Sequence, residues 1–255
     1  MVYRLSQRPQ LVAHMGYSAR EPANTVRSTL AAVEAGADMV EMDVCMTSDG
    51  HMVAIHGPDL ERSTSGAGAV AESTLDYITS LDVKFRGELV PGVKVPTLTE
   101  MVEATPDAAF NFDLKTARAR RPIVDFIVAN RLVDRAVVSG VTAWGVGVVR
   151  RADPSVSVLV NLDRVDRALA ATKAGRYWLP LRYRWLLSRP GVTALNINHR
   201  WVSRGLVDAV HALGAEVWAF TVDDQKRVDQ LIEKGVDSLT TNVPGELMLA
   251  PAVAN

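Results

Sequence analysis

The stretch EVWAFTVDDQKRVDQLIEKGVDSLTT, residues 216–241, contains the repeating unit from which this fold can be predicted. An apolar run at Glu216–Val222 is followed by a stretch with helical spacing at Gln225–Lys234 and by a second apolar run at Ser238–Thr241. Gly235 stands between helix and strand, where a left-handed residue commonly ends a helix. Strand, helix and strand in this order predict a parallel βαβ unit.

The same alternation extends over the rest of the chain. Six more apolar runs bring the predicted strands to eight; these runs are Leu11–His14, Met39–Val44, Ala108–Leu114, Ala136–Ser139, Ser157–Asn161 and Ala194–Asn198. Further helical stretches lie at Thr25–Ala35, Leu98–Ala104, Pro122–Asn130, around Arg150–Ala152 and at Leu206–Leu213. Eight such units in 255 residues predict an α/β protein with one (β/α)8 (TIM) barrel domain over residues 1–255.

Helix ends and two irregular segments refine this prediction. Gly36 and Gly214 resemble Gly235 in position, and Asn24 is placed to cap the first helix. Met52–His56 is predicted to return from strand 2 as a hairpin, which makes a small hairpin and loop insertion there. We expect residues 62–87 to cover part of the barrel mouth, and residues 163–189 to form a long loop and helix near the substrate.

Composition and charge limit the classes of function. Lys and Arg total 28 against 29 Asp and Glu, so there is no basic excess to bind nucleic acid or an anionic membrane. The single cysteine, Cys45, excludes an internal disulfide and a multi-cysteine zinc site. The first ten residues lack the apolar core of a signal peptide, and no apolar run is long enough to span a membrane. We expect a cytoplasmic enzyme without stable membrane association, which could form an oligomer.

Charged residues interrupt two predicted strands. Glu41 and Asp43 alternate within strand 2, and Asp113 and Lys115 alternate at the end of strand 3, so each pair shares one face of its strand. Buried like charges repel unless a cation lies between them, and a hard divalent ion such as Mg²⁺ or Ca²⁺ would serve. The structural alternatives are a carboxylate pair bridged by an arginine or by helix N-termini, and an internal salt bridge to Lys115.

Histidines end two of the predicted strands. His14 ends the first strand and His56 ends the hairpin, and each alone would more often be a structural residue. Beside a carboxylate cluster they suggest an acid and a base, because imidazole exchanges a proton near neutral pH. His199 follows the sixth strand and is a candidate substrate contact.

Several motifs resemble those of the glycerophosphodiester phosphodiesterases. The resemblance runs in order through nearly the whole chain and is weakest between residues 140 and 190. The matching motifs are Ala13–Gly16, Pro22–Thr25, Glu41–Val44, His56–Gly66, Val95–Glu100, Asn111–Lys115, Val217–Asp223 and Gly235–Pro244.

The resemblance implies a metal-dependent hydrolase that splits a small-molecule phosphodiester into an alcohol and a phosphomonoester. It assigns acid and base roles to His14 and His56, and one Mg²⁺ or Ca²⁺ ion to Glu41, Asp43 and Asp113. It also implies that Lys115 contacts phosphate and that Phe220 lines the pocket. We add Arg20 and Trp218 as candidate substrate contacts.

The chain departs from the family pattern at three places near the histidines. Met15 stands where the family has arginine, Ala23 where it has glutamate, and Gly57 where it has aspartate. Arg20, Arg62, Arg182 or Arg184 could supply the missing guanidinium. The change puts the substrate in question and leaves two alternatives open. One is lyase or cyclase chemistry on a specialised phosphate or diphosphate ester, and the other is a binding barrel without catalysis.

Overall fold

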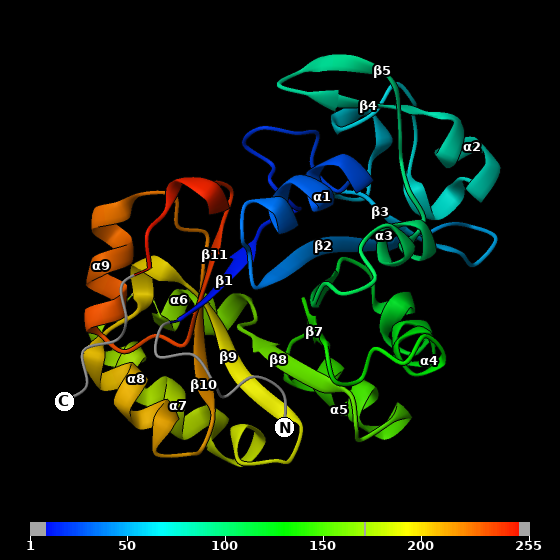
Figure 1. The fold of residues 1–255 in the computed structure, drawn as a ribbon. Coiled ribbons are helices and arrows are strands. Elements are labelled where there is room, and N and C mark those ends of the chain that lie inside the picture. The colour runs from blue at the N-terminus through cyan, green and yellow to red at the C-terminus, as the bar shows by residue number, and fades with distance from the viewer. Residues whose placement is uncertain (1–8, 171, 250–255) are drawn as a thin grey trace.

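The computed structural model describes residues 9–170 and 172–249 and shows a closed barrel of eight parallel strands (Figure 1). The strands are β1 (Gln10–Ala13), β2 (Met39–Met46), β6 (Phe110–Leu114), β7 (Ala136–Ser139), β8 (Ser157–Asn161), β9 (Val192–Asn198), β10 (Glu216–Phe220) and β11 (Ser238–Thr241). The barrel closes because β1 pairs with β11 on one side and with β2 on the other. The predicted (β/α)8 fold and all eight predicted strands are confirmed.

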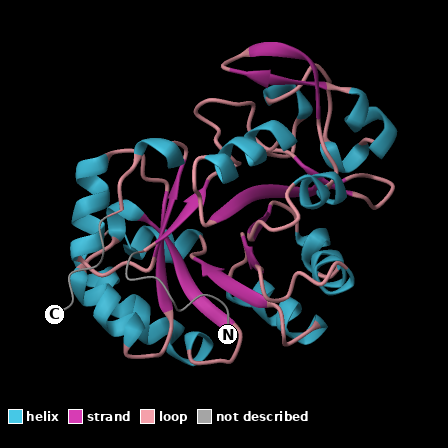
Figure 2. Cartoon of the chain, in the orientation of Figure 1, coloured by secondary structure: helices cyan, strands magenta, loops and turns pink. Residues whose placement is uncertain are grey.

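Helices surround the strands, as Figure 2 shows. They are α1 (Val26–Glu34), α3 (Leu98–Ala104), α4 (Pro122–Ala129), α5 (Ala143–Ala152), α6 (Arg164–Ala170), α7 (Lys173–Leu187), α8 (Arg204–His211) and α9 (Gln225–Glu233). Gly36, Gly214 and Gly235 have φ values of 82°, 77° and 84°. Glycine takes this conformation without a steric penalty, so the predicted helix ends are confirmed.

The predicted cap of the first helix is wrong by one residue. Thr25 is the N-cap of α1, and it forms a capping box with Ser28 in which each side chain accepts the other's backbone N–H at 3.2 Å. Asn24 has φ 59° and lies before the cap. Its side chain is engaged with strand β2 instead, as described below.

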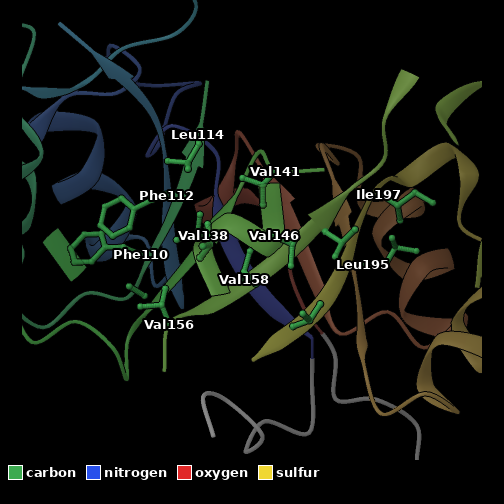
Figure 3. Close-up of a cluster of buried hydrophobic side chains, with 14 of the residues drawn as sticks. Phe110, Phe112, Leu114, Val138, Val141, Val146, Val156, Val158, Leu195 and Ile197 are labelled. Atoms are coloured by element: carbon green, nitrogen blue, oxygen red, sulfur yellow. The ribbon is translucent and has the colours of Figure 1, made fainter. Parts of the chain in front are cut away.

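Alternation along the strands gives the barrel two apolar layers. Residues that point outward pack under the helices, among them Phe110, Phe112, Val138 and Val158, which Figure 3 labels. Residues that alternate with these point into the barrel, since successive strand residues face opposite ways. At the N-terminal ends of the strands they form a separate buried cluster, which we call the floor: Val12, Met39, Ala109, Val137, Leu159, Ala194 and Trp218.

The insertion after strand β2 has its own small core. Strand β3 (Met52–Ala54) pairs antiparallel with β2, which confirms the predicted hairpin. Helix α2 (Leu75–Ser80) and a two-stranded sheet of β4 (Asp82–Phe85) and β5 (Glu88–Lys94) follow, and they lie beyond α1 in Figure 1. Cys45 packs in this core with Ile55, Leu60 and Ile78, as the packing role expected for it requires. That the whole chain is one domain stays a prediction.

Within residues 163–170 and 172–189 the structure has two helices, α6 and α7, rather than a long loop with one helix. Buried Asp166 joins them: it accepts the hydroxyl of Tyr183 and lies 2.6 Å from Nε of Arg182. Helix α7 packs against α8 and β9. In the described part of the chain, no helix is long and apolar enough to cross a membrane.

Candidate active site

Three carboxylates meet inside the barrel, above the floor. Glu41 and Asp43 alternate on β2, and the strand register places Asp113 of β6 directly beside Asp43. One oxygen from each of the three lies within 4.8 Å of the others. Glu41 is 3% exposed and Asp43 is fully buried. We call Glu41, Asp43 and Asp113 the carboxylate cluster, and the prediction that they face one another is confirmed.

Lys115 partly neutralises this cluster. Its Nζ lies 2.6 Å from Oδ1 of Asp43 and also pairs with Asp113. Burial lowers the pKa of Lys115, but the Asp113, Asp43 and Glu41 carboxylates outweigh burial and raise it. The internal salt bridge considered from the sequence is therefore present, although one ammonium cannot balance three carboxylates.

The remaining charge suits a divalent cation. Three carboxylates and one ammonium leave a formal charge of −2, and the available donors are oxygens, which Mg²⁺ and Ca²⁺ prefer. The pKa of Glu41 is raised well above its usual range, chiefly by burial and then by the Asp43 and Asp113 carboxylates. The cluster can thus hold a metal ion, and such an ion would relieve the repulsion that raises this pKa.

The loop after β1 holds Glu41 in place. The backbone N–H of Met15 donates to Oε2 of Glu41 at 2.8 Å, and Met15 adopts the left-handed region with φ 54°. A non-glycine residue rarely takes this conformation unless its surroundings enforce it. Gly16 follows with φ 75°, and a Cβ there would overlap with Ser28 of helix α1. Close packing of this loop on α1 therefore requires glycine at position 16.

Asp43 and Asp113 are positioned by residues that the sequence did not reveal. Asn24 donates its Nδ2–H to Asp43 Oδ2 at 2.8 Å and accepts the Asp43 N–H at 2.9 Å. A Cβ on Gly140 would overlap with Oδ1 of Asp113, so glycine leaves room for that carboxylate. Asn24 belongs to the Pro22–Thr25 motif that resembles the family, but the sequence suggested only a helix cap for it, and a glycine after a strand, such as Gly140, has commoner explanations.

His14 lies next to the cluster in a defined orientation. Its Nε2 is 4.0 Å from Oε2 of Glu41, and its Nδ1 is 2.7 Å from Oδ1 of Asn242. The Asn242 amide is oriented by Asp223, which accepts the Nδ2–H at 2.6 Å and the backbone N–H at 2.7 Å. Since Asn242 Oδ1 can only accept, Nδ1 carries the proton, and in the neutral ring Nε2 has the lone pair facing the cluster.

His56 follows the hairpin strand β3 and lies beside β2. The preceding residue, Ile55, donates its N–H to the carbonyl of Asp43 at 3.1 Å. The Nδ1 atom of His56 is buried and has no hydrogen-bond partner among the described residues. A buried ring nitrogen without a partner is unusual in a folded protein.

The other four predicted substrate contacts, Arg20, Trp218, His199 and Phe220, differ in burial and in hydrogen-bond partners. Arg20 is exposed and pairs with Glu246 at 3.1 Å. Trp218 is buried in the floor, where its Nε1–H donates to Glu216 at 2.9 Å, so its indole faces away from the cluster. His199 accepts Nε–H of Arg227 at 3.1 Å, and burial, then Arg227, lowers its pKa. Phe220 is half-buried at the C-terminal end of β10.

A cleft of about 520 Å³ is lined by Met15 and Asn242, which hydrogen-bond to Glu41 and His14, but not by His14 or the three carboxylates themselves. Three parts of the chain line it: the loop after β1, the β4–β5 hairpin, and the loops after β10 and β11. The hairpin thus reaches the barrel mouth, as expected for residues 62–87. None of the four arginines considered as replacements at position 15 lines this cleft, whereas Arg86 does.

Comparison with known proteins shows that the chain is similar to members of one family. The model of the glycerophosphoryl diester phosphodiesterase family matches residues 14–246. A glycerophosphodiester phosphodiesterase from Caldanaerobacter subterraneus is 29% identical, with 93% of this chain and 96% of that protein covered. One from Bacillus altitudinis is 26% identical, with 92% and 95% covered.

Solved structures have the same fold. A phosphodiesterase from Oleispira antarctica, in complex with the product sn-glycerol-3-phosphate, superposes with a TM-score of 0.77 at 23% identity over 95% of this chain and 97% of that one. A glycerophosphoryl diester phosphodiesterase structure from Silicibacter pomeroyi also gives 0.77, at 24% identity, with 94% and 93% covered.

Proposed function

Because the chain belongs to the glycerophosphoryl diester phosphodiesterase family, we propose that it hydrolyses a glycerophosphodiester-like small molecule to an alcohol and a phosphomonoester. The observation that carries this proposal is the approach of the His14 imidazole, Nε2 first, to within 4.0 Å of the carboxylate cluster. A proton acceptor beside a site for a divalent cation is the combination that phosphodiester hydrolysis needs. The cytoplasmic location and a possible oligomer stay predictions.

We assign the metal site to Glu41, Asp43 and Asp113, with Mg²⁺ or Ca²⁺ as the ion. When bound, the ion would stabilise negative charge on the phosphoryl oxygens. Lys115 adds a positive charge next to Asp43 and Asp113 and is proposed to donate to a phosphoryl oxygen. Phe220 and His199 stay proposed pocket residues.

We assign proton transfer to the two histidines. His14 would accept a proton at Nε2, because Asn242 occupies its Nδ1–H and the lone pair of Nε2 faces the site. The resulting imidazolium would lie beside Glu41, whose negative charge would stabilise it. His56 would serve as the second proton-transfer group, the role that the family resemblance implies for it.

The test is turnover of bis(4-nitrophenyl) phosphate after treatment with chelator and addition of Mg²⁺, Ca²⁺ or Mn²⁺. We expect activity only with added cation, and a loss of about a hundredfold or more in His14→Ala and in His56→Ala. His211→Ala is the matched control, because His211 ends helix α8 and pairs with Asp237 away from the cluster. Full activity of both histidine variants in chelated enzyme would exclude this mechanism.

Two alternatives give different results in the same experiments. A persistent cyclic phosphate in the phosphorus NMR spectrum would indicate lyase or cyclase chemistry, whereas a monoester that carries oxygen from labelled water indicates hydrolysis. A binding barrel without catalysis would show neither turnover nor calorimetric binding of divalent cations.

A further inference from the structure

We propose that the cleft beside His14 is a specificity subsite for one alcohol substituent of the diester, and that it selects a substituent with an apolar stem ending in an anionic group. The inference rests on the proposed function, because it concerns the same reacting centre. It goes further by assigning the class of substituent from the residues that line the cleft.

Two residues connect the cleft with the proposed reacting centre. Met15 lines the cleft, and its backbone N–H holds Glu41. Asn242 lines it as well and holds His14 at 2.7 Å. A substituent in the cleft would therefore be attached to a phosphorus centre next to the carboxylate cluster.

The wall formed by the loop after β1 is mostly apolar. Met15, Ala19 and Ala23 line it, and Phe85 of the hairpin adds an aromatic ring. Ser18 also lines it, but its hydroxyl already donates to Oδ1 of Asn242 at 2.9 Å. The four apolar side chains offer no hydrogen bonds to the hydroxyls of a bare glycerol substituent, and desolvated hydroxyls without partners weaken binding. An alkyl stem would instead bury apolar surface there. This wall thus favours a stem less polar than glycerol.

The hairpin side of the cleft is cationic. Lys84 and Arg86 both line it, and both are anchored by backbone carbonyls: Lys84 by Glu61 at 2.6 Å and Arg86 by Ala19 at 3.0 Å. A carbonyl oxygen carries no net charge, so neither hydrogen bond neutralises its cation. The Glu61 carboxylate accepts the N–H of Gly68 at 2.9 Å and also attracts the Lys84 ammonium, and both interactions lower the pKa of Glu61. Arg86, held by a neutral carbonyl, is therefore the cation that favours an anionic group on the substituent.

The acid on the opposite side does not cancel this preference. Asp223 lines the cleft, but its oxygens already accept from Thr241 Oγ1 at 2.9 Å and from both nitrogens of Asn242. With Lys84, Arg86 and Asp223 the lining has a formal charge of +1. The positive charge therefore lies on the hairpin, across from the carboxylate that orients His14.

Arg86 is held in this position at a conformational cost. It has φ 53°, in the left-handed region that a non-glycine residue seldom adopts. Its guanidinium lies over the ring of Phe85, 5.0 Å from the centroid, and reaches the loop after β1. This contact connects the hairpin to the loop after β1 and holds the cation next to the apolar wall. Unfavourable backbone conformations of this kind concentrate at ligand sites.

The experiment compares three 4-nitrophenyl phosphodiesters whose second alcohol is methyl, hexyl or 5-carboxypentyl. We expect kcat/KM of the Mg²⁺-loaded enzyme to rise in that order. Arg86→Ala should lower the ratio of the carboxypentyl to the hexyl diester by about tenfold or more, the loss of one charge-assisted contact. Lys94→Ala is the matched control: Lys94 pairs with Asp82 in the same hairpin and does not line the cleft, so the ratio should persist.

Two results would overturn the subsite. An equal loss for all three diesters in Arg86→Ala would assign Arg86 to the phosphate or to the hairpin's stability, and a wild-type preference for the methyl diester would exclude an apolar stem. Absence of turnover for every diester would reject the proposed function instead. Calorimetry with 6-hydroxyhexanoate separates the two failures: weaker binding to Arg86→Ala than to wild type supports the subsite, and no binding to wild type refutes it.

Discussion

Along β2 and β6 the floor and the carboxylate cluster lie two to four residues apart, yet they have opposite chemistry. On β2, Met39 belongs to the floor and Glu41 to the cluster. On the neighbouring strand β6, Asp113 belongs to the cluster, and Ala109, the residue before this strand, belongs to the floor. Both layers point into the barrel. The floor has apolar contacts that favour folding, whereas the cluster concentrates like charges that oppose it. The comparison indicates that one layer maintains the barrel while the other is maintained for binding and chemistry.

The largest effect expected from this comparison is on activity. Glu41→Gln keeps the side-chain size and removes one charge, so kcat/KM for an aryl phosphodiester should fall on the order of a thousandfold or more. The metal-free variant should melt at the same temperature as wild type or higher, because a buried repulsion is relieved. Kinetics and thermal unfolding check both parts. Lower thermal stability with unchanged activity would reverse the roles of the two layers.

The corresponding change in the floor should have the opposite profile. Met39 is 2% exposed, and Met39→Ala should lower the free energy of unfolding by about 2–5 kcal/mol through lost burial and a cavity. Urea unfolding measures this, with Met39→Leu as the control that keeps side-chain volume and should cost less than about 1.5 kcal/mol. The folded fraction of Met39→Ala should keep kcat/KM close to wild type. A specific loss of kcat/KM would show that the floor also shapes the site.

A smaller effect on kcat/KM is expected when the residue that orients His14 is replaced. Asn242→Ala breaks the hydrogen bond to Nδ1 and releases the ring, so kcat/KM should fall about ten- to a hundredfold. The pH–rate profile should also change, since the tautomer of His14 is no longer fixed. Ser18→Ala is the milder control: it removes a 2.9 Å bond to Asn242 and leaves the His14 contact. Equal losses in the two variants would argue against the orienting role.

The smallest effect is a pH dependence confined to the cluster. Burial and the neighbouring carboxylates raise the folded-state pKa of Glu41, so the folded protein holds this proton where the unfolded chain has released it. The contribution of Glu41 to the free energy of unfolding is therefore fully present below its unfolded-state pKa of about 4.3. It is lost as the pH rises toward the folded-state pKa, by at most about 1.4 kcal/mol per pH unit. Urea unfolding of chelated protein should show this decline, and Glu41→Gln should lack it. An identical slope in both proteins would rule out Glu41 as the origin of the decline.

Features that depend on residues close together in the sequence were predicted from the sequence. Apolar runs and helical spacing located the eight strands, and a spacing of two placed Glu41 with Asp43 and Asp113 with Lys115 on shared faces. Glycines before strands marked helix ends. The strands, helices and shared faces depend on the 2.0 or 3.6 residue period of a local backbone conformation, and the glycines depend on a left-handed conformation; a single segment displays both by itself. The irregular residues 163–189 show no such period, and there the prediction of one loop and helix differed from the two helices found.

Contacts between distant segments were decided by the tertiary structure. Asn242 meets His14 across 228 residues, and Asn24 bonds Asp43 rather than capping helix α1. Trp218 is two residues from Phe220 on the same inward face, and only its depth in the closed barrel puts it in the floor. Arg86 faces Met15 because the inserted hairpin folds over the mouth. The alternation of residues along a strand determines which face of the sheet a side chain is on. Its contact partners come from other strands and loops, and only the closed barrel determines which of these lie close to it.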